Sequence, residues 1–174
     1  IINGLQSDTL TSATNNWYFN SVYIGGNVVS TGAATTSGFK RVTSDTTDFR
    51  NNIVVNDRSN ASGTGKHYVM NLNAATTVTS TGNNFLHTGV GSVFGVVAAV
   101  DAASFAAWQA ATSLDAGSFF SDPKFLNAVG SAASVDLHIN PALTTLIEGN
   151  GVAVAAPTDD FDGQVRASLS PVDI

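Results

Sequence analysis

The sequence predicts an all-β solenoid of about three to four coils, with one short helix and an irregular C-terminal cap. Three observations predict this fold class. An apolar rung that carries Asn recurs three times, clusters of Gly, Ser, Thr and Asn separate the rungs, and a helical pattern replaces the strand pattern after residue 100. We therefore expect coils at residues 1–100, continuing upstream of residue 1, and a helix plus cap at residues 101–174 of the same domain.

The repeated rung is a short apolar strand that is entered through Gly or Asn and a further Asn. Its copies are Tyr23–Val29, Phe49–Val55 and Thr81–Leu86. Within them, Asn27, Asn52 and Asn84 lie 25 and 32 residues apart, and a unit that recurs at such a period is typical of solenoids. Asn tolerates the left-handed backbone region, and its amide can bond to the next coil. These three residues therefore predict a structural ladder, with sugar binding as the alternative.

A second apolar run follows each rung, which predicts at least two strands in every coil. These runs are Gly38–Val42, Tyr68–Leu72 and Val93–Val97. The stretches 30–37 and 56–66 are poor in apolar residues and rich in Gly, Ser and Thr. They predict loops that bulge from the solenoid.

The stretch from Asp101 to Thr112 has a helical pattern. Asp101 is a capping residue, and Phe105 and Trp108 lie three apart on one face, with Ala filling most other positions. We expect Trp108 to seal this helix to the core, with sugar stacking as the alternative. Beyond Leu114 the chain is irregular and contains all four prolines, which predicts a cap of turns and short strands.

Composition argues against several classes of function. Charged residues are 11% of the chain, where about 25% is ordinary, so the surface must consist largely of neutral hydroxyl and amide groups. The net charge is −6 and the seven Lys and Arg residues are scattered, which argues against nucleic-acid binding and membrane-surface binding. The chain has no Cys, so disulfides and thiolate metal sites are excluded. Its apolar runs are too short for membrane insertion.

The last 70 or so residues carry four phrases whose order and spacing are specific. They are Phe105–Thr112; Asp115–Ser118 with Asp122–Phe125; Asp136–Ile139 leading to Pro141-Ala142; and Asp160–Arg166 followed by Val172–Ile174. In these phrases the chain resembles a bacterial right-handed parallel β-helix family, the pectate-lyase-like superfamily. Within it, the resemblance is to surface proteins whose C-terminal module precedes a variable cell-surface anchor.

The chain departs from that family pattern at two places. Asn140-Pro141 stands where Ser-Pro is usual, and the chain stops at Ile174 where the family continues into Gly-Ala and an acidic residue. The resemblance implies a right-handed β-helix and an extracellular or bacterial cell-surface location. We interpret the chain as a fragment or a processed product.

The resemblance to polysaccharide lyases makes an active site worth seeking. Such chemistry needs carboxylates that hold calcium and a basic side chain that removes a proton. The coils offer three Asp and three Arg close in sequence: Asp45, Asp48, Asp57, Arg41, Arg50 and Arg58. Asp48 and Arg50 lie two apart in a strand, share a face and can pair with each other. We therefore assign no catalytic residue.

The densest acidic stretch is the candidate metal site. Asp159, Asp160 and Asp162 precede Gly163 and resemble the start of a calcium loop, but the acidic residue that completes an EF-hand is missing. The pattern favours a turn in which Asp160 and Asp162 accept backbone hydrogen bonds and Arg166 pairs with one of them. We therefore expect no cofactor, with calcium as the alternative. The histidines, His67, His87 and His138, show no metal-ligand spacing.

The function predicted from these features is a non-catalytic structural or adhesive part of a secreted or cell-surface bacterial protein. The alternative is a polysaccharide-active lyase or hydrolase whose groove lies partly in upstream coils. A minor alternative is ice binding, because Thr77, Thr79 and Thr81 share one face of a strand.

The expected partners follow from the same interpretation. We expect upstream coils or another chain to cover the N-terminal coil at Ile1, Ile2 and Leu5, because an open solenoid end exposes strand edges and core. Polysaccharide and the anchoring or secretion machinery of the cell surface are the other expected partners.

Overall fold

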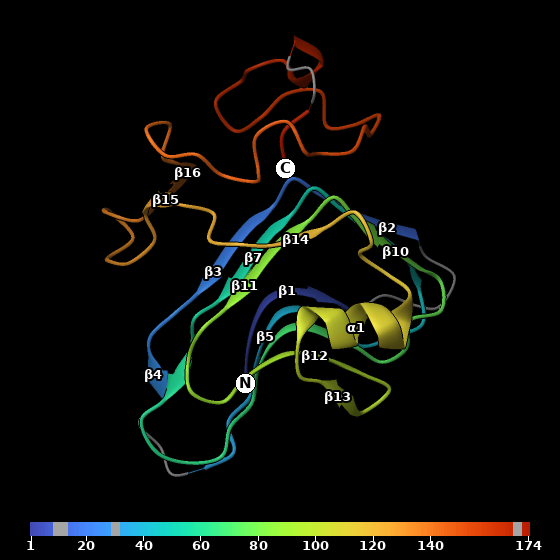
Figure 1. Cartoon of the computed structure of the whole chain (residues 1–174), viewed down its shortest axis with the longest axis vertical. Coiled ribbons are helices and arrows are strands. Elements are labelled where there is room, and N and C mark those ends of the chain that lie inside the picture. The colour runs from blue at the N-terminus through green and yellow to red at the C-terminus, as the bar shows by residue number, and fades with distance from the viewer. Residues whose placement is uncertain (9–13, 29–31, 169–171) are drawn as a thin grey trace.

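The structure, a computed structural model, describes residues 1–8, 14–28, 32–168 and 172–174. It is a parallel β-solenoid of about four turns, followed by a largely irregular C-terminal segment (Figure 1). The predicted fold class is thereby confirmed. Val29 at the end of the first rung, and residues 30 and 31 of the first expected loop, lie outside the described residues.

The strands of successive turns stack into three sheets, which we call A, B and C. Sheet A contains β1 (Ile2–Ser7), β5 (Thr36–Arg41), β9 (His67–Leu72) and β12 (Ser92–Val97), joined in antiparallel fashion by β13 (Val100–Ala102). Sheet B contains β2 (Thr14–Tyr18), β6 (Thr46–Arg50) and β10 (Val78–Thr81). Sheet C contains β3 (Ser21–Ile24), β7 (Ile53–Asn56), β11 (Asn84–His87) and β14 (Phe119–Phe120), and β4 (Asn27–Val28) pairs with β8 (Ser59–Asn60).

The length of a turn varies because the loops differ while the strands stay in register. Ile2, Thr36, His67 and Ser92 lie side by side in sheet A, at steps of 34, 31 and 25 residues. Sheet C continues beyond residue 100, because β14 pairs with β11. The solenoid therefore extends into the segment that the sequence assigned to the cap.

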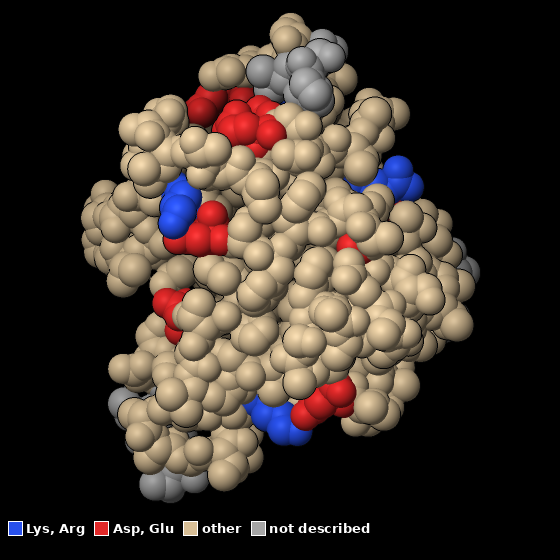
Figure 2. All heavy atoms as spheres, viewed as in Figure 1, with Lys and Arg blue, Asp and Glu red and all other residues tan. Residues whose placement is uncertain are grey.

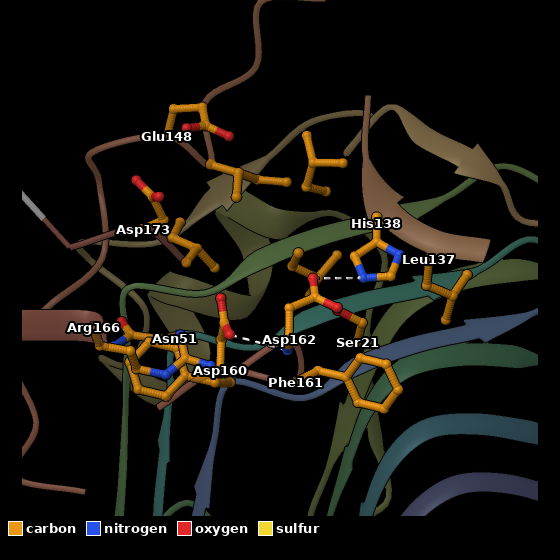
Figure 3. Close-up of a pocket in the computed structure, with 15 residues that line it drawn as sticks. Ser21, Asn51, Leu137, His138, Glu148, Asp160, Phe161, Asp162, Arg166 and Asp173 are labelled. Atoms are coloured by element: carbon orange, nitrogen blue, oxygen red, sulfur yellow. Dashed lines mark hydrogen bonds and ion pairs between the residues drawn. The ribbon is translucent and has the colours of Figure 1, made fainter. Parts of the chain in front are cut away.

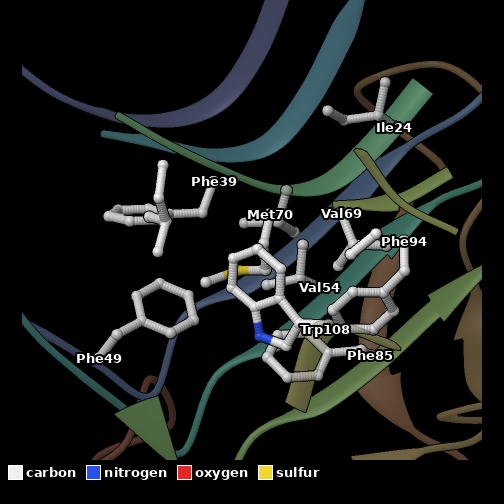
Figure 4. Close-up of a cluster of buried hydrophobic side chains, with 12 residues drawn as sticks. Ile24, Phe39, Phe49, Val54, Val69, Met70, Phe85, Phe94 and Trp108 are labelled. Atoms are coloured by element: carbon white, nitrogen blue, oxygen red, sulfur yellow. The ribbon is translucent and has the colours of Figure 1, made fainter. Parts of the chain in front are cut away.

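The interior is a continuous stack of apolar side chains, one set per turn (Figure 4). Phe39 and Phe49 lie with ring centroids 4.6 Å apart, and Phe85 and Phe94 follow at 5.4 Å further along the stack. Each such side chain contributes about 2 kcal/mol through burial. A Cβ on Gly38 would lie 2.3 Å from Val54 Cγ1, so only glycine lets sheet A approach sheet C at that level.

The corner between sheets B and C is built the same way in three turns. A residue with positive φ ends the B strand, namely Phe19 (φ 55°), Asn51 (φ 55°) or Gly82 (φ 65°). The next residue continues a ladder along the stack: Asn20, Asn52, Asn83 and, in the fourth turn, Ser118. Asn52 Oδ1 accepts from Asn20 N at 3.0 Å, and Asn83 Oδ1 accepts from Asn52 N at 2.9 Å. Each ladder residue thus satisfies the backbone of the turn before it.

The structure places the three predicted ladder residues in different positions. Asn52 lies in the ladder. Asn27 is exposed on β4 opposite Ser59, and Asn84 lies one residue beyond the ladder, opposite Ile53, where it exchanges hydrogen bonds with Ser121. The ladder therefore passes through Asn20 and Asn83 rather than through Asn27 and Asn84, because the residue after the left-handed corner is the one whose side chain faces the backbone of the preceding turn.

The short helix α1 (Phe105–Thr112) closes the last turn. Its N-cap is Ser104, whose hydroxyl accepts from Ala107 N, whereas the expected capping residue Asp101 lies in β13 and accepts from Lys66 and Tyr68. Trp108 is 0% exposed and packs on Phe94, which confirms its expected place in the core.

The indole N–H of Trp108 points to a buried carboxylate. Trp108 Nε1 donates to Asp115 Oδ2 at 2.9 Å, and Asp115 Oδ1 accepts from Ser80, Asn83 and Ser118. Burial raises the pKa of the Asp115 carboxyl, against the effect of these hydrogen bonds. The cluster joins the helix to the end of the ladder.

The C-terminal segment packs on the outer face of sheet C. It contains the antiparallel pair β15 (Phe125–Asn127) and β16 (Asp136–Ile139) and the 3-10 turn η1 (Arg166–Ser168). Ile147 and Ile174 form an apolar cluster with Ile53 and Val55. Asn51 fastens the segment by two hydrogen bonds, donating to Val152 O at 2.7 Å and accepting from Val152 N at 2.8 Å.

The other end of the solenoid carries the surface that the expected partner would cover. Ile1 and Ile2 are exposed, and Leu5 and Trp17 are half-buried at the edge of the first turn. Among the described residues, none of the helices has the length and apolar character needed to cross a membrane.

Candidate functional site

A large concave region lies between the first turn of the solenoid and the C-terminal segment. It consists of two adjoining cavities of about 810 and about 240 Å³. Both are lined by Phe19, Ser21, Leu137, His138 and Phe161. Figure 3 shows the lining of the smaller cavity, with Ser21, Leu137, His138 and Phe161 labelled. We call this region the cap hollow. Its volume falls in the range of small-molecule sites.

Phe19 contributes an aromatic ring from the solenoid side. It occupies the left-handed corner position between β2 and β3, where the following turns have Asn51 and Gly82. The guanidinium of Arg166 lies over its ring, 3.7 Å from the centroid. This cation–π contact joins the corner of the first turn to η1.

His138 lies between two carboxylates on the opposite wall. Its Nδ1 bonds to Asp136 Oδ1 on the same strand, and its Nε2 lies 3.1 Å from Asp162 Oδ2 (Figure 3). The hydrogen bond to Asp136, the charge of Asp136 and the charge of Asp162 together raise the pKa of His138. The imidazole thereby links β16 to the 159–162 turn.

Phe161 stands beside this histidine with little cover of its own. Its ring centroid lies 6.1 Å from that of His138, and the side chain is 93% exposed. The face of this ring is therefore available to pack against a ligand.

Acidic side chains outnumber basic ones around the hollow. The carboxylates are those of Asp136, Glu148, Asp160, Asp162 and Asp173, and the basic groups are Arg166 and His138. Burial and the neighbouring charge of Asp173 raise the pKa of Glu148. Figure 2 shows acidic side chains in the upper part of the visible face, on a surface that otherwise carries few charges. The hollow is therefore electronegative.

The predicted metal residues form a hydrogen-bonded turn at the edge of this hollow. Asp160 Oδ1 accepts from the backbone N–H of Asp162 at 3.0 Å and of Gln164 at 2.7 Å. Asp159 O accepts from Arg166 Nε at 3.3 Å, and Asp162 pairs with His138. Within the described part of the chain, no three His, Cys, Asp or Glu side chains are grouped so as to hold a metal ion.

The acidic and basic residues singled out in the coils do not converge on one site. Arg41 and Asp45 form a fully buried pair, with Nε and Oδ1 3.1 Å apart. Burial alone would raise the pKa of Asp45, but hydrogen bonds from Ser7, Asn15 and Arg41 outweigh it and lower the pKa to about 2. This pair fastens the corner between sheets A and B.

The remaining members of that group are also engaged by the scaffold. Asp48 accepts from Arg50 Nε and from Tyr18 Oη, both at 2.6 Å, on the outer face of sheet B. Asp57 accepts from Tyr23 Oη at 3.1 Å, and Arg58 donates to Gly25 O at 2.9 Å. The contacts of Tyr18, Tyr23 and Arg58 join neighbouring turns of the solenoid, whereas the Asp48–Arg50 pair lies within β6.

The threonines proposed for ice binding do not form an array. Thr77 has φ 63° and donates to Asp45 O at 2.9 Å, so its hydroxyl serves a corner. The positions that align with Thr79 along sheet B are Asp48 and Asn16, and those that align with Thr81 are Arg50 and Tyr18. This sheet presents mixed polar groups rather than rows of hydroxyl groups.

The cap hollow was missed from the sequence because its members are far apart in the chain. Phe19, His138 and Phe161 come from three segments, and only the Asp-rich turn gave a local signal.

Comparison of this chain with models of protein families, with curated proteins and with solved structures finds no match.

Proposed function

We propose that this chain is a non-catalytic, adhesive part of a secreted or cell-surface protein of the bacterial type that its sequence resembles, and that it contacts polysaccharide. The observation that carries the proposal is the engagement of the coil residues able to do chemistry. Asp45 is held by Arg41, Ser7 and Asn15, and Asp115 by four donors, so these carboxylates stabilise the stack.

The outer surface also suits adhesion to a hydroxyl-rich partner. Sheet B presents amide, hydroxyl and phenol groups outward, including those of Asn16, Thr79 and Tyr18. Such groups exchange hydrogen bonds with water and with sugars alike, and the charges of Asp48 and Arg50 on this face are paired with each other. Rigid strands hold them at fixed spacing, which reduces the entropy lost on binding.

One observation favours the alternative function, that of a polysaccharide-active enzyme. His138, Arg166 and several carboxylates line a single hollow, which is the arrangement from which acid–base catalysis is built. In this hollow, however, His138 is paired with Asp136 and Asp162, and Asp160 accepts two backbone hydrogen bonds. Because these side chains are already engaged, the hollow is better suited to binding a ligand than to acid–base catalysis.

The two functions are separated by measuring binding and turnover on the same polysaccharides. We expect the protein to co-sediment with insoluble polysaccharides such as chitin, chitosan and cellulose. We expect no new reducing ends and no unsaturated products after prolonged incubation with soluble polysaccharides, including polygalacturonate. Release of either product by pure protein would overturn the adhesive proposal in favour of the enzyme.

A further inference from the structure

We propose that the cap hollow is a saccharide-binding site that prefers sugars bearing amino groups over uronic acids. The inference rests on the proposed adhesive function and assigns it a place and a ligand class. Three features carry it: an exposed aromatic ring at a cavity of suitable size, a strained aromatic residue on the opposite wall, and an excess of carboxylates.

The cavity and the ring of Phe161 match the shape of a sugar. The larger cavity, of about 810 Å³, accommodates a short oligosaccharide, and the 93% exposed Phe161 ring lies on its wall. The C–H face of a pyranose packs on such a ring and removes apolar area of both partners from water. Ser21 and Ser134 also line this cavity and are exposed, so hydroxyl groups are available there to a sugar.

The backbone conformation of Phe19 is a second reason to place the sugar in the cap hollow. A left-handed φ is costly for phenylalanine, and the equivalent corners of the next two turns carry Asn51 and Gly82, which adopt it readily. The first turn thus keeps an aromatic ring, over which the guanidinium of Arg166 lies, at a corner that Asn or Gly forms in the following turns. Its ring lines both cavities, which gives the strain a functional explanation.

The charges decide which sugars fit. Glu148, Asp160 and Asp173 line the smaller cavity together with one guanidinium, that of Arg166. Glu148 and Asp173 are close enough for the charge of Asp173 to raise the pKa of Glu148. A protonated amino group placed among these carboxylates relieves their mutual repulsion, whereas a uronate carboxylate adds to it.

The first experiment compares ligands of equal length. Isothermal titration calorimetry at low salt would use oligomers of glucosamine, N-acetylglucosamine and galacturonic acid. We expect the glucosamine oligomer to bind about ten-fold or more tightly than the galacturonic acid oligomer, and its affinity to fall as salt is raised. Equal or tighter binding of the galacturonic acid oligomer would overturn the charge assignment.

The second experiment places the ligand in the hollow by two substitutions. Phe161→Ala removes an exposed ring, and Phe19→Asn removes the other ring while keeping a residue suited to the left-handed corner. We expect each to weaken binding of the glucosamine oligomer about ten-fold or more. Phe161→Ala should leave the melting temperature unchanged, and in Phe19→Asn relief of the left-handed φ offsets loss of the contact with Arg166. Val90→Ala, a change of an exposed side chain at a distant loop, is the matched control and should bind like wild type.

The outcomes distinguish this inference from the function on which it rests. If wild type binds the oligomers but Phe161→Ala and Phe19→Asn bind equally well, the hollow is not the site and adhesion stands. If wild type binds no polysaccharide or oligomer at all, the adhesive function falls and the inference falls with it.

Discussion

The outer faces of sheets B and C differ although the two sheets come from the same turns of the same stack. On sheet B the outward positions hold Asn16, Asp48 and Thr79, and this face remains open to water. On sheet C the outward positions include Ile53 and Val55, and Ile147 and Ile174 of the C-terminal segment cover them.

The inner faces of the two sheets are alike. Phe49 of sheet B and Val54 and Phe85 of sheet C all join one buried cluster. Side chains alternate between the two faces of a strand, and those on the inner face fill the core. Only the outer positions are therefore free to differ. The apolar character of one outer face therefore decides where the rest of the chain packs, and thereby where the cap hollow forms.

The largest expected effect comes from truncating the covered face. Ile53→Ala removes a 4% exposed side chain from beneath the C-terminal segment and should lower the free energy of unfolding by about 3 kcal/mol. Thr79→Ala on the open face should change it by less than about 0.5 kcal/mol. Denaturant unfolding of both variants checks the contrast. Equal effects would contradict the division into a covered and an open face.

The corner that joins sheets A and B should be acid-sensitive. The pKa of Asp45 lies at about 2 in the folded protein, below its ordinary value, so its ionised form stabilises the fold above the ordinary pKa. This contribution, about 2 kcal/mol, is lost as the pH falls from about 4 through about 2. Unfolding free energies of wild type and Asp45→Asn across this range test it. The variant should be less stable than wild type at neutral pH, and the difference should shrink towards pH 2.

Loss of the two Asn51–Val152 hydrogen bonds should loosen the C-terminal segment on the covered face of sheet C and leave the open face of sheet B intact. Asn51→Gly keeps a residue suited to the left-handed corner but deletes both hydrogen bonds to Val152, which should cost about 1–2 kcal/mol. Hydrogen exchange should quicken at Val152 and stay unchanged in β6. Asn71→Ala, which removes a hydrogen bond to Ser37 on sheet A, serves as the control. Unchanged protection of the Val152 amide from exchange would contradict the proposed role of these hydrogen bonds.

The smallest effect should come from His138. Its folded pKa is raised, so the protonated form strengthens the link between β16 and the 159–162 turn below the ordinary pKa of histidine. The link weakens as the pH rises through the folded pKa. The neighbouring charges are Asp136 and Asp162, with Asp160 and Arg166 in the same hollow. Titration of the His138 ring by NMR should give a raised pKa that falls in Asp162→Asn, while the sheet B signals should not change.

The solenoid could be predicted because its signals are local. Short apolar runs separated by Gly, Asn and Thr appear in every turn, and Phe105 with Trp108 marked the helix. The exact residues of the ladder could not be predicted, because Asn51-Asn52 and Asn83-Asn84 offer two amides at each corner. Which of the two amides faces the preceding turn depends on where the left-handed residue lies, at Asn51 and at Gly82. The Asn-Asn pairs do not carry that information by themselves.

Local patterns in the sequence are enough to predict that the chain coils, where its helix lies and that its surface is nearly uncharged, because strand alternation, helical spacing and composition act over a few residues. Only the tertiary structure decided that Phe19, His138 and Phe161 share one hollow and that Asn51 holds Val152. Those contacts join segments about a hundred residues apart. They depend on how the apolar outer face of sheet C is covered, which no local pattern specifies.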